Sequence, residues 1–554
     1  MAAAKNTTAD SSIMTTASRK KPPLLSTALF LVVLLAVNYR TVQARLPPVP
    51  STVAKNVRGG GGGYRGGGSS TAGGGWNPHD DAATGDASSA IEKGSLWDDD
   101  EEEEEEEATS TTMPIISAAT AMTPKGGGIV GVGVSGAYPP PTANIDDGAS
   151  IPTEIFNLVK SIVGAGVLGL PAGIAAFGGT SMALIPAVTL MTLAGLLSGY
   201  CFSLIGRACA YTGAKSYRQA WERAVSPKTA WIPAAACFMV TSCSVLAYSM
   251  ILSVTLPSLA SAFLGVLITR TQALVGVTTV ALLPLCLMKS LKSLGPFSLV
   301  GIMGMFYTCI AMFIRWMDGS YGVTGRFIRD LPLDLSPRFG RPEDLGDLLN
   351  PNIFLLVSML STAFMAHYNA PKFYLELKNN TLRRYNTVVG VSFFVSLLLF
   401  VAVASFGFAT FGKACSGLVL NNYSTDDKLM SLSRVAVAVS LLFSYPLAFG
   451  GVRDGLLDLL KVEKRPDSLL NTITVLLLTM ITGLAYALTD LRKLLAFNGA
   501  TWGNAVIYLL PTYMFIQCAK NLRPELRKEV PIVALTGLIG LAMGLLGTAI
   551  AVSS

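Results

Sequence analysis

The chain has 554 residues, of which 51% are hydrophobic and 14% charged, and its formal net charge is +7. Soluble proteins carry about a quarter charged residues, so this composition excludes an ordinary soluble globular class and predicts an integral membrane protein. The net charge combines an acidic tail with basic loops between apolar segments, and it therefore does not indicate a nucleic-acid partner. The eight cysteines lack metal-ligand spacing and predict neither a disulfide framework nor a metal site.

The first 150 residues differ in composition from the rest of the chain. Residues 1–44 contain a short apolar run at 24–37 that follows "RKK" and precedes the small residue Ala44, which is the pattern of a signal peptide. Residues 45–150 are rich in glycine and include "DDDEEEEEEE" at 98–107. Such sequence buries too little apolar area to fold, so we expect a disordered tail. The acidic run is either a solvated segment or a docking site for regulatory partners.

Residues 151–554 form the predicted transmembrane domain. Apolar runs of about 18 residues or more are long enough to span a bilayer as helices. The predicted segments lie near 155–177, 180–206, 231–256, 271–288, 294–315, 353–376, 387–411, 431–449, 468–489, 494–516 and 531–552. The sequence therefore predicts an all-α integral membrane protein with about eleven transmembrane helices.

Two signals for the orientation of this domain disagree. The loops on one side of the predicted membrane hold about nineteen Lys and Arg with their flanks, against about ten on the other side, which places the start of the first helix in the cytosol. A cleaved signal peptide at 1–44 would place the same end outside. We give more weight to the loops because they sum many residues, and cleavage of residues 1–44 is left as an alternative.

The first segment carries residues that interrupt a helix. In "FNLVKSIVGAGVLGLPAGIAAFG", residues 156–178, glycines recur from Gly164 onward and a proline follows at 171. Irregular backbone at membrane depth persists only where protein buries it or it lines a cavity, and transporters bind ligands at such breaks. The alternative is a seam of small residues that allows close helix packing. We favour the interrupted helix because polar Asn157 and Lys160 precede the glycines.

A second interruption is predicted five segments later, in "STAFMAHYNAPKFYLEL" at 361–377. Pro371 removes a backbone hydrogen bond, and the residue before a proline is disfavoured in helical geometry. His367 and Asn369 place polar side chains at the same depth, and the histidine is either functional or a packed structural donor. Interruptions in the first and sixth segments are typical of a five-plus-five inverted repeat, here with one additional helix, and a zwitterion suits both kinds of free helix end.

Three stretches resemble the amino acid/auxin permease family, which includes the sodium-coupled neutral amino acid transporters. They are "FNLVKSIVGAGVLGLP" at 156–171, "AFMAHYNAPKFYLELKNNTLRRYNTVVGVS" at 363–392 and "LAFNGATWGNAVIYLLP" at 495–511. The resemblance covers about residues 150–552 and does not include the tail. It implies the leucine-transporter-type fold and transport of amino acids with sodium or protons as the coupling ion.

The resemblance also implies which residues bind the substrate and the ion. The substrate would lie against both interruptions and a tyrosine of the third helix. The residues so implied are Ile162, Val163, Gly164, Ala165, Gly166, Val167, Leu168, Ala366, His367, Asn369 and Tyr248. The coupling ion would lie near Asn157, Lys160 and Ser444, where the family usually has a threonine at the last position. Lys160 is either a protonatable substitute for sodium or a side chain that extends to the membrane interface.

Together these features favour a secondary active transporter of amino acids in the plasma membrane or an endomembrane such as the vacuole. The alternative is an amino acid sensor of the same fold that signals through its N-terminal tail. A membrane enzyme is disfavoured because the predicted spans hold one histidine, few carboxylates and no clustered catalytic set. The expected partners are the amino acid, the coupling ion, the lipid bilayer and regulators of the acidic tail, and no cofactor is expected.

Overall fold

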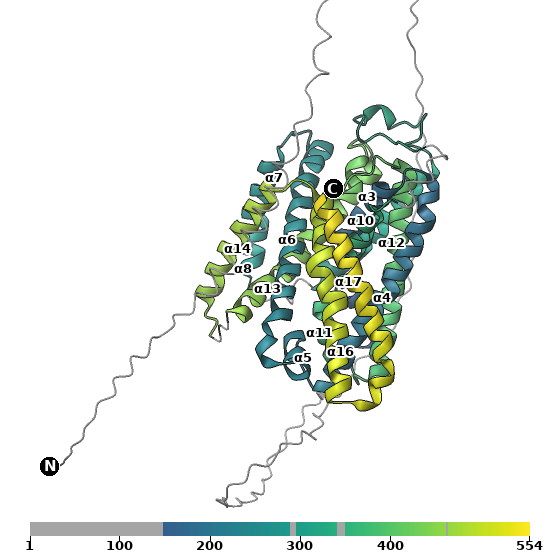
Figure 1. Ribbon diagram of the computed structural model, residues 1–554. Coiled ribbons are helices and arrows are strands. Elements are labelled where there is room, and N and C mark those ends of the chain that lie inside the picture. Colours follow the sequence, from purple (N-terminus) through teal and green to yellow (C-terminus); the bar gives the residue numbers. More distant parts are fainter. Residues whose placement is uncertain (1–147, 289–294, 341–349, 461, 463, 554) are drawn as a thin grey trace, which may run out of the picture. The chain divides into compact units, whose positions relative to one another are not determined.

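The computed structural model of this protein describes residues 148–288, 295–340, 350–460, 462 and 464–553 (Figure 1). The regular secondary structure of these residues is helical, and β-structure among them consists of two isolated bridges. The predicted signal peptide at 1–44, and the predicted tail as far as residue 147, lie outside the described residues.

Helices account for most of the described chain (Figure 1). The earlier ones are α2 (Ile151–Ile162), α3 (Leu170–Phe177), α4 (Leu184–Thr212), α5 (Tyr217–Ala224), α6 (Trp231–Leu259), α7 (Arg270–Val277), α8 (Leu283–Leu287) and α9 (Gly295–Met317). The later ones are α10 (Ile353–Ala363), α11 (Ala370–Glu376), α12 (Leu382–Phe411), α13 (Lys428–Leu459), α14 (Asp467–Ala487), α15 (Leu491–Asn498), α16 (Leu510–Asn521) and α17 (Val530–Ser553).

Eight helical stretches of the described chain are long and apolar enough to cross a membrane, and α2 with α3 makes a ninth if the pair is one bent span. A shorter apolar helix, Gly301–Met317, lies within α9. Each of the predicted segments overlaps helical structure. The prediction of an all-helical, multi-pass membrane protein is confirmed, whereas the number eleven stays a prediction.

Burial separates central helices from peripheral ones. Of the most apolar stretch within Ile353–Glu376, which contains α10 and α11, 72% is buried, but the share is only 22% for Pro524–Ser553, which contains α17. α10 packs against α3, α4, α15 and α17, while α17 exposes leucines such as Leu535 and Leu538. Exposed leucine is the expected surface of a helix that faces lipid. The second predicted interruption therefore lies in the protein interior.

The helix α4 extends beyond its predicted end. The sequence predicts an apolar segment near 180–206 and a loop from residue 207, but the helix continues to Thr212. Both Nη atoms of Arg207 donate to the carboxylate of Glu529 at 2.7 Å, and its guanidinium lies over the ring of Phe515, 4.6 Å from the centroid. A paired charge does not require the helix to end, so the helix runs past the apolar segment.

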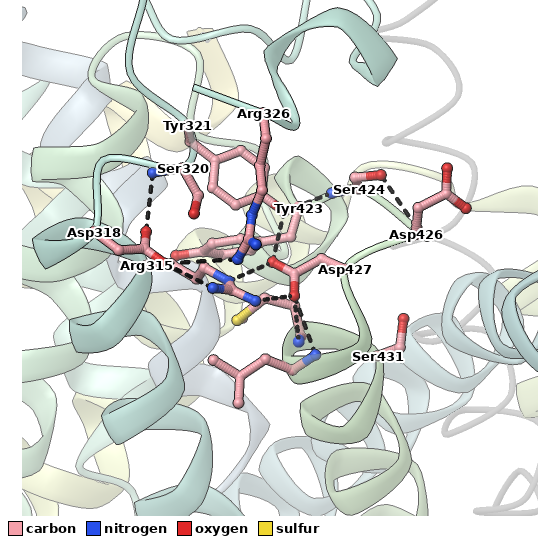
Figure 2. Close-up of polar contacts among 12 residues, drawn as sticks. Arg315, Asp318, Ser320, Tyr321, Arg326, Tyr423, Ser424, Asp426, Asp427 and Ser431 are labelled. Atoms are coloured by element: carbon pink, nitrogen blue, oxygen red, sulfur yellow. Dashed lines mark hydrogen bonds and ion pairs between the residues drawn. The ribbon is translucent and has the colours of Figure 1, made fainter. Parts of the chain in front are cut away.

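A buried charged cluster joins α9 to α13 (Figure 2). Asp427, which is fully buried, is the N-cap of α13 and accepts hydrogen bonds from the N–H groups of Leu429 and Met430 at 3.1 and 3.3 Å. The guanidinium of Arg315, near the end of α9, donates to both carboxylate oxygens at 2.8 Å, and the Tyr321 hydroxyl donates at 2.9 Å. These five hydrogen bonds offset the cost of removing the carboxylate from water.

Two side chains at the edge of this cluster respond to its charges. Burial and the nearby Asp427 carboxylate raise the pKa of Tyr321. Burial also acts to raise the pKa of Asp318, but hydrogen bonds from Ser320 and the ion pair with Arg315, 2.7 Å between Oδ2 and Nη1, hold it below its usual value. Tyr321 is therefore a neutral donor at neutral pH, and Asp318 is an ionised acceptor.

Candidate functional site

The first interruption lies between α2 and α3. The helix α2 ends at Ile162, Gly164 has extended backbone with φ −112° and ψ −170°, and a 3-10 turn from Ala165 to Gly169 leads into α3. The N–H of Gly164 bonds to the carbonyl oxygen of Ile162 at 2.9 Å and not to the residue four positions earlier. The helical pieces Ile151–Ile162 and Gly166–Phe177 are bent by 44° relative to each other. The regular series of backbone hydrogen bonds stops at the glycines.

The second interruption separates α10 from α11. The helix α10 ends at Ala363, Ala366 departs from helical geometry with φ −135° and ψ 1°, and a 3-10 turn, His367–Asn369, precedes α11. Pro371 lies in the first turn of α11, where its missing N–H leaves no hydrogen bond unmade. The change in backbone geometry coincides with the polar residues and the proline of this segment.

These two interruptions lie against each other. A Cβ atom added to Gly166 would lie 3.4 Å from the Cα atom of Ala363, in ordinary van der Waals contact, so the two backbones are neighbours at this point. Asn369 Nδ2 donates to Ser161 Oγ at 3.3 Å, which joins the turn before α11 to the last turn of α2. The irregular backbone of one segment therefore lies next to that of the other.

Of two side chains that the sequence assigns to the site, Tyr248 lies at the first interruption, whereas His367 points toward α4. The hydroxyl of Tyr248, on α6, lies beside Gly164, 3.6 Å from the place that a Cβ atom would take there. The side chain of His367 is fully buried and directed toward α4. Its Nε2 lies 2.9 Å from the carbonyl oxygen of Ser198, and its ring meets Phe202 edge-on with centroids 5.3 Å apart. The structure thus brings Tyr248 to the first interruption and places His367 in a packed environment.

Five other residues in and beside the two turns are apolar and buried. Val167, Leu168 and Ala366 are fully buried, and Ile162 and Val163 are almost so. Because these side chains lack polar atoms, a ligand held here would bond to their main-chain N–H and C=O groups. Such dipoles act strongly in surroundings of low dielectric constant, where water does not compete.

The candidates for ion coupling are less closely grouped. Asn157 is exposed on α2, and Lys160 is half-buried one turn later. Ser444 is half-buried on α13, whose main neighbours are α6 and α9, whereas α2 packs mainly against α12. The structure therefore brings together the substrate-binding candidates more clearly than the coupling-ion candidates.

Sequence reasoning missed two residues that shape the site. Ser161 accepts a hydrogen bond from Asn369 in the second interruption. It could have been identified from the sequence, because it is a polar residue in an apolar helix just before Gly164. Gly499 lies in a π-helical turn that follows α15, and a Cβ atom there would overlap the carbonyl oxygen of Ser358 on α10. The "GAT" stretch therefore packs directly on α10, shortly before the second interruption.

Comparison with known proteins gives the relationships of this chain. The family described as "Transmembrane amino acid transporter protein" matches residues 147–551. This chain is similar to two proteins named sodium-coupled neutral amino acid transporter 11. The relative from Bos taurus is 23% identical, and the alignment covers 75% of this chain and 89% of the relative. The relative from Danio rerio is 24% identical, and the alignment covers 67% of this chain and 80% of the relative. The solved structure "Inward facing conformation of Mhp1" aligns at 13% identity with a TM-score of 0.49, covering 75% of this chain and 92% of that one.

The family match extends from just before α2 to the last turn of α17 and so includes both interruptions. It confirms the resemblance carried by the three sequence motifs. It also confirms that the protein is a multi-pass membrane transporter and not an enzyme. The chain belongs to the transmembrane amino acid transporter family.

Proposed function

We propose that this protein is a secondary active transporter that moves amino acids by alternating access, with sodium or protons as the coupling ion. The observation that carries the proposal is the proximity of Gly166 to Ala363, because each lies beside a 3-10 turn at the end of a helix. Free N–H groups at the start of one helical piece attract a carboxylate, and free carbonyl groups at the end of another attract a cation. An amino acid zwitterion satisfies both.

The proposed substrate site consists of the main chain of residues 162–168 and 366–369, with Tyr248 beside Gly164. Asn157, Lys160 and Ser444 are the proposed coupling-ion residues. The names of the relatives specify neutral amino acids and sodium, which supports a neutral substrate and sodium coupling here.

We further infer eleven spans, namely the eight apolar stretches, the pair α2 and α3, α9, and the stretch from α15 to α16. Packing supports a five-plus-five repeat. The second spans of the two halves, α4 and α12, pack together, and so do the third spans, α6 and α13. Other contacts are reciprocal, because α9 packs on α12 and α13 while α16 packs on α4 and α15 on α6. A pseudo-two-fold axis requires such reciprocity, and α17 is then the additional helix.

Counterflow uptake into proteoliposomes tests the proposal. The full chain is supplied with labelled neutral, cationic or anionic amino acids at fixed pH, with and without sodium, and we expect exchange of neutral amino acids. Gly166→Leu should abolish exchange, because its side chain would occupy the space between the interruptions. Gly390→Leu is the matched control on α12, because a Cβ atom there has no atom of the described chain within 4 Å.

Two results would contradict this function. Undiminished exchange by Gly166→Leu would show that the contact between the interruptions is not the site. Amino acid binding by the wild-type protein without any flux would favour the alternative of a sensor.

A further inference from the structure

Glu154 is a buried carboxylate that the roles described above do not use. It lies in the first turn of α2, it is 1% exposed, and neither carboxylate oxygen has a hydrogen-bond partner among the described residues. The start of the helix is already capped by Ser150, whose Oγ accepts from the N–H of Thr153 at 3.4 Å. Glu154 therefore has no capping role to explain its burial.

No hydrogen bond or ion pair within the described chain compensates a charge on Glu154. The charges that act on it belong to Glu376 and Lys372 of α11. These two side chains form their own ion pair at 3.8 Å and are 50% and 66% exposed. Tyr385 of α12 is buried nearby, but its hydroxyl donates to the carbonyl oxygen of Phe202 at 3.2 Å.

The other charged side chains on α2 and on the elements packed against it donate no hydrogen bond to Glu154 in the described chain. Lys160 lies farther along α2, and Lys378 follows α11. Arg384 of α12 donates to the carbonyl oxygen of Lys378 at 3.1 Å. Arg315 of α9 belongs to the cluster of Figure 2. The carboxyl group is therefore enclosed without a counter-ion in contact.

An ionised carboxylate that is removed from water without a partner is strongly disfavoured relative to its neutral form. We propose that Glu154 is a proton-binding site, occupied while α2 is closed against α11 and α12 and emptied when α2 moves outward. The ligand is a proton from the aqueous side on which α2 begins, which the basic loops predict to be the cytosol. This inference rests on the proposed function, in which α2 is one of the moving helical pieces.

Two backbone hydrogen bonds attach the chain just before α2 to the end of α11. The N–H of Ala149 donates to the carbonyl oxygen of Glu376 at 2.7 Å, and the N–H of Lys378 donates to the carbonyl oxygen of Ala149 at 2.9 Å. The opposite end of α2 stops before the extended backbone of Gly164. Rotation of α2 about that point would break these two bonds and bring Glu154 to water, where its O–H bond breaks and the proton passes to the solvent.

Hydrogen exchange of the α2 amides tests the proton site without a substrate. The full chain is placed in lipid nanodiscs, and the protection of residues 151–162, corrected for intrinsic exchange, is measured at two pH values, about 5.5 and about 8. Because the closed form holds one more proton, the closed-to-open ratio changes by up to about tenfold per pH unit, and we expect protection to fall at least about fivefold at the higher pH. Glu154→Gln and Glu154→Met, which are permanently neutral, should stay protected at both values.

Glu525→Gln is the matched control, because Glu525 is 62% exposed and its charge is not among those that act on Glu154, so this variant should keep the wild-type response. Melting temperatures of all variants verify that they are folded. Equal protection of the wild type at both pH values overturns the proposal, and so does an unchanged pH response in the two Glu154 variants.

Counterflow separates this proposal from the transport function. With pH varied only on the side on which α2 begins, acidification should slow wild-type exchange at least about threefold, and exchange by Glu154→Gln should not depend on that pH. Absence of wild-type exchange at every pH, together with pH-dependent protection of α2, refutes transport and supports the proton site. Exchange by the wild type without pH-dependent protection refutes the proton site alone.

Discussion

Replacement of Asp427 by alanine removes the central acceptor of the cluster between α9 and α13 (Figure 2). Its fully buried carboxylate accepts two hydrogen bonds from Arg315, one from Tyr321 and two from backbone N–H groups of α13. Without it the guanidinium of Arg315, whose side chain is 10% exposed, keeps Asp318 as its remaining acidic partner, 2.7 Å away. We therefore expect a large loss of stability.

The magnitude follows from two overlapping effects. Removal of one member of a buried ion pair costs about 3–5 kcal/mol, and loss of an N-cap costs about 1 kcal/mol. Because both effects concern the same carboxylate and Asp318 retains part of the compensation, we expect a total of about 3–4 kcal/mol for Asp427→Ala. In a chain of this size the melting temperature should fall by roughly 3–5 °C. Asp427→Asn keeps the shape and some hydrogen bonds, and it should lose about 2 kcal/mol.

Tryptophan fluorescence of the detergent-solubilised full chain, at one fixed heating rate, measures these melting temperatures. Asp426→Ala is the matched control, because the adjacent Asp426 is exposed and should change the melting temperature by about 1 °C or less. The double variant with Arg315→Met and Asp427→Leu should recover part of the loss, because it buries no unpaired charge. Equal shifts for Asp427→Ala and Asp426→Ala would refute the reasoning from burial and pairing.

Three further predictions concern single positions. Gly499→Ala should destabilise the protein by about 1–3 kcal/mol, because the added Cβ atom would overlap the carbonyl oxygen of Ser358. Gly483→Ala is the control and should leave the stability unchanged, because no described atom outside its own turn lies within 4 Å of the added Cβ atom. Equal melting temperatures of the two variants would contradict this prediction. Because the pKa of Asp318 is below its usual 3.8, its ion pair contributes stability above that pH and loses it as the pH falls further. The melting-temperature deficit of Asp318→Asn should therefore be equal at two pH values, about 7 and about 5, and a deficit that disappears by the lower value would be inconsistent with the shift. Tyr248→Phe should raise the KM of uptake several-fold at an unchanged melting temperature, and an unchanged KM would remove its hydroxyl from the site.

The helices could be predicted from the sequence because helix formation in a bilayer depends on local chemistry. Backbone polar groups in lipid must bond within their own segment, so an apolar run that spans the bilayer has to be helical. Gly164 and Pro371 act on the backbone of their own segments, and the irregular turns occur beside them. The bounds were less predictable where a distant partner intervenes, as Glu529 does for Arg207 in α4.

Contacts between distant segments were decided only by the tertiary structure. The approach of Gly166 to Ala363, the direction of His367 toward Ser198 and the burial of Glu154 depend on which helices are neighbours. In a soluble protein the apolar face of a helix shows which side packs against the rest of the protein, and the polar face shows which side meets water. Lipid is as apolar as leucine, so a membrane helix presents similar side chains to lipid and to protein, and its sequence alone does not reveal its partners.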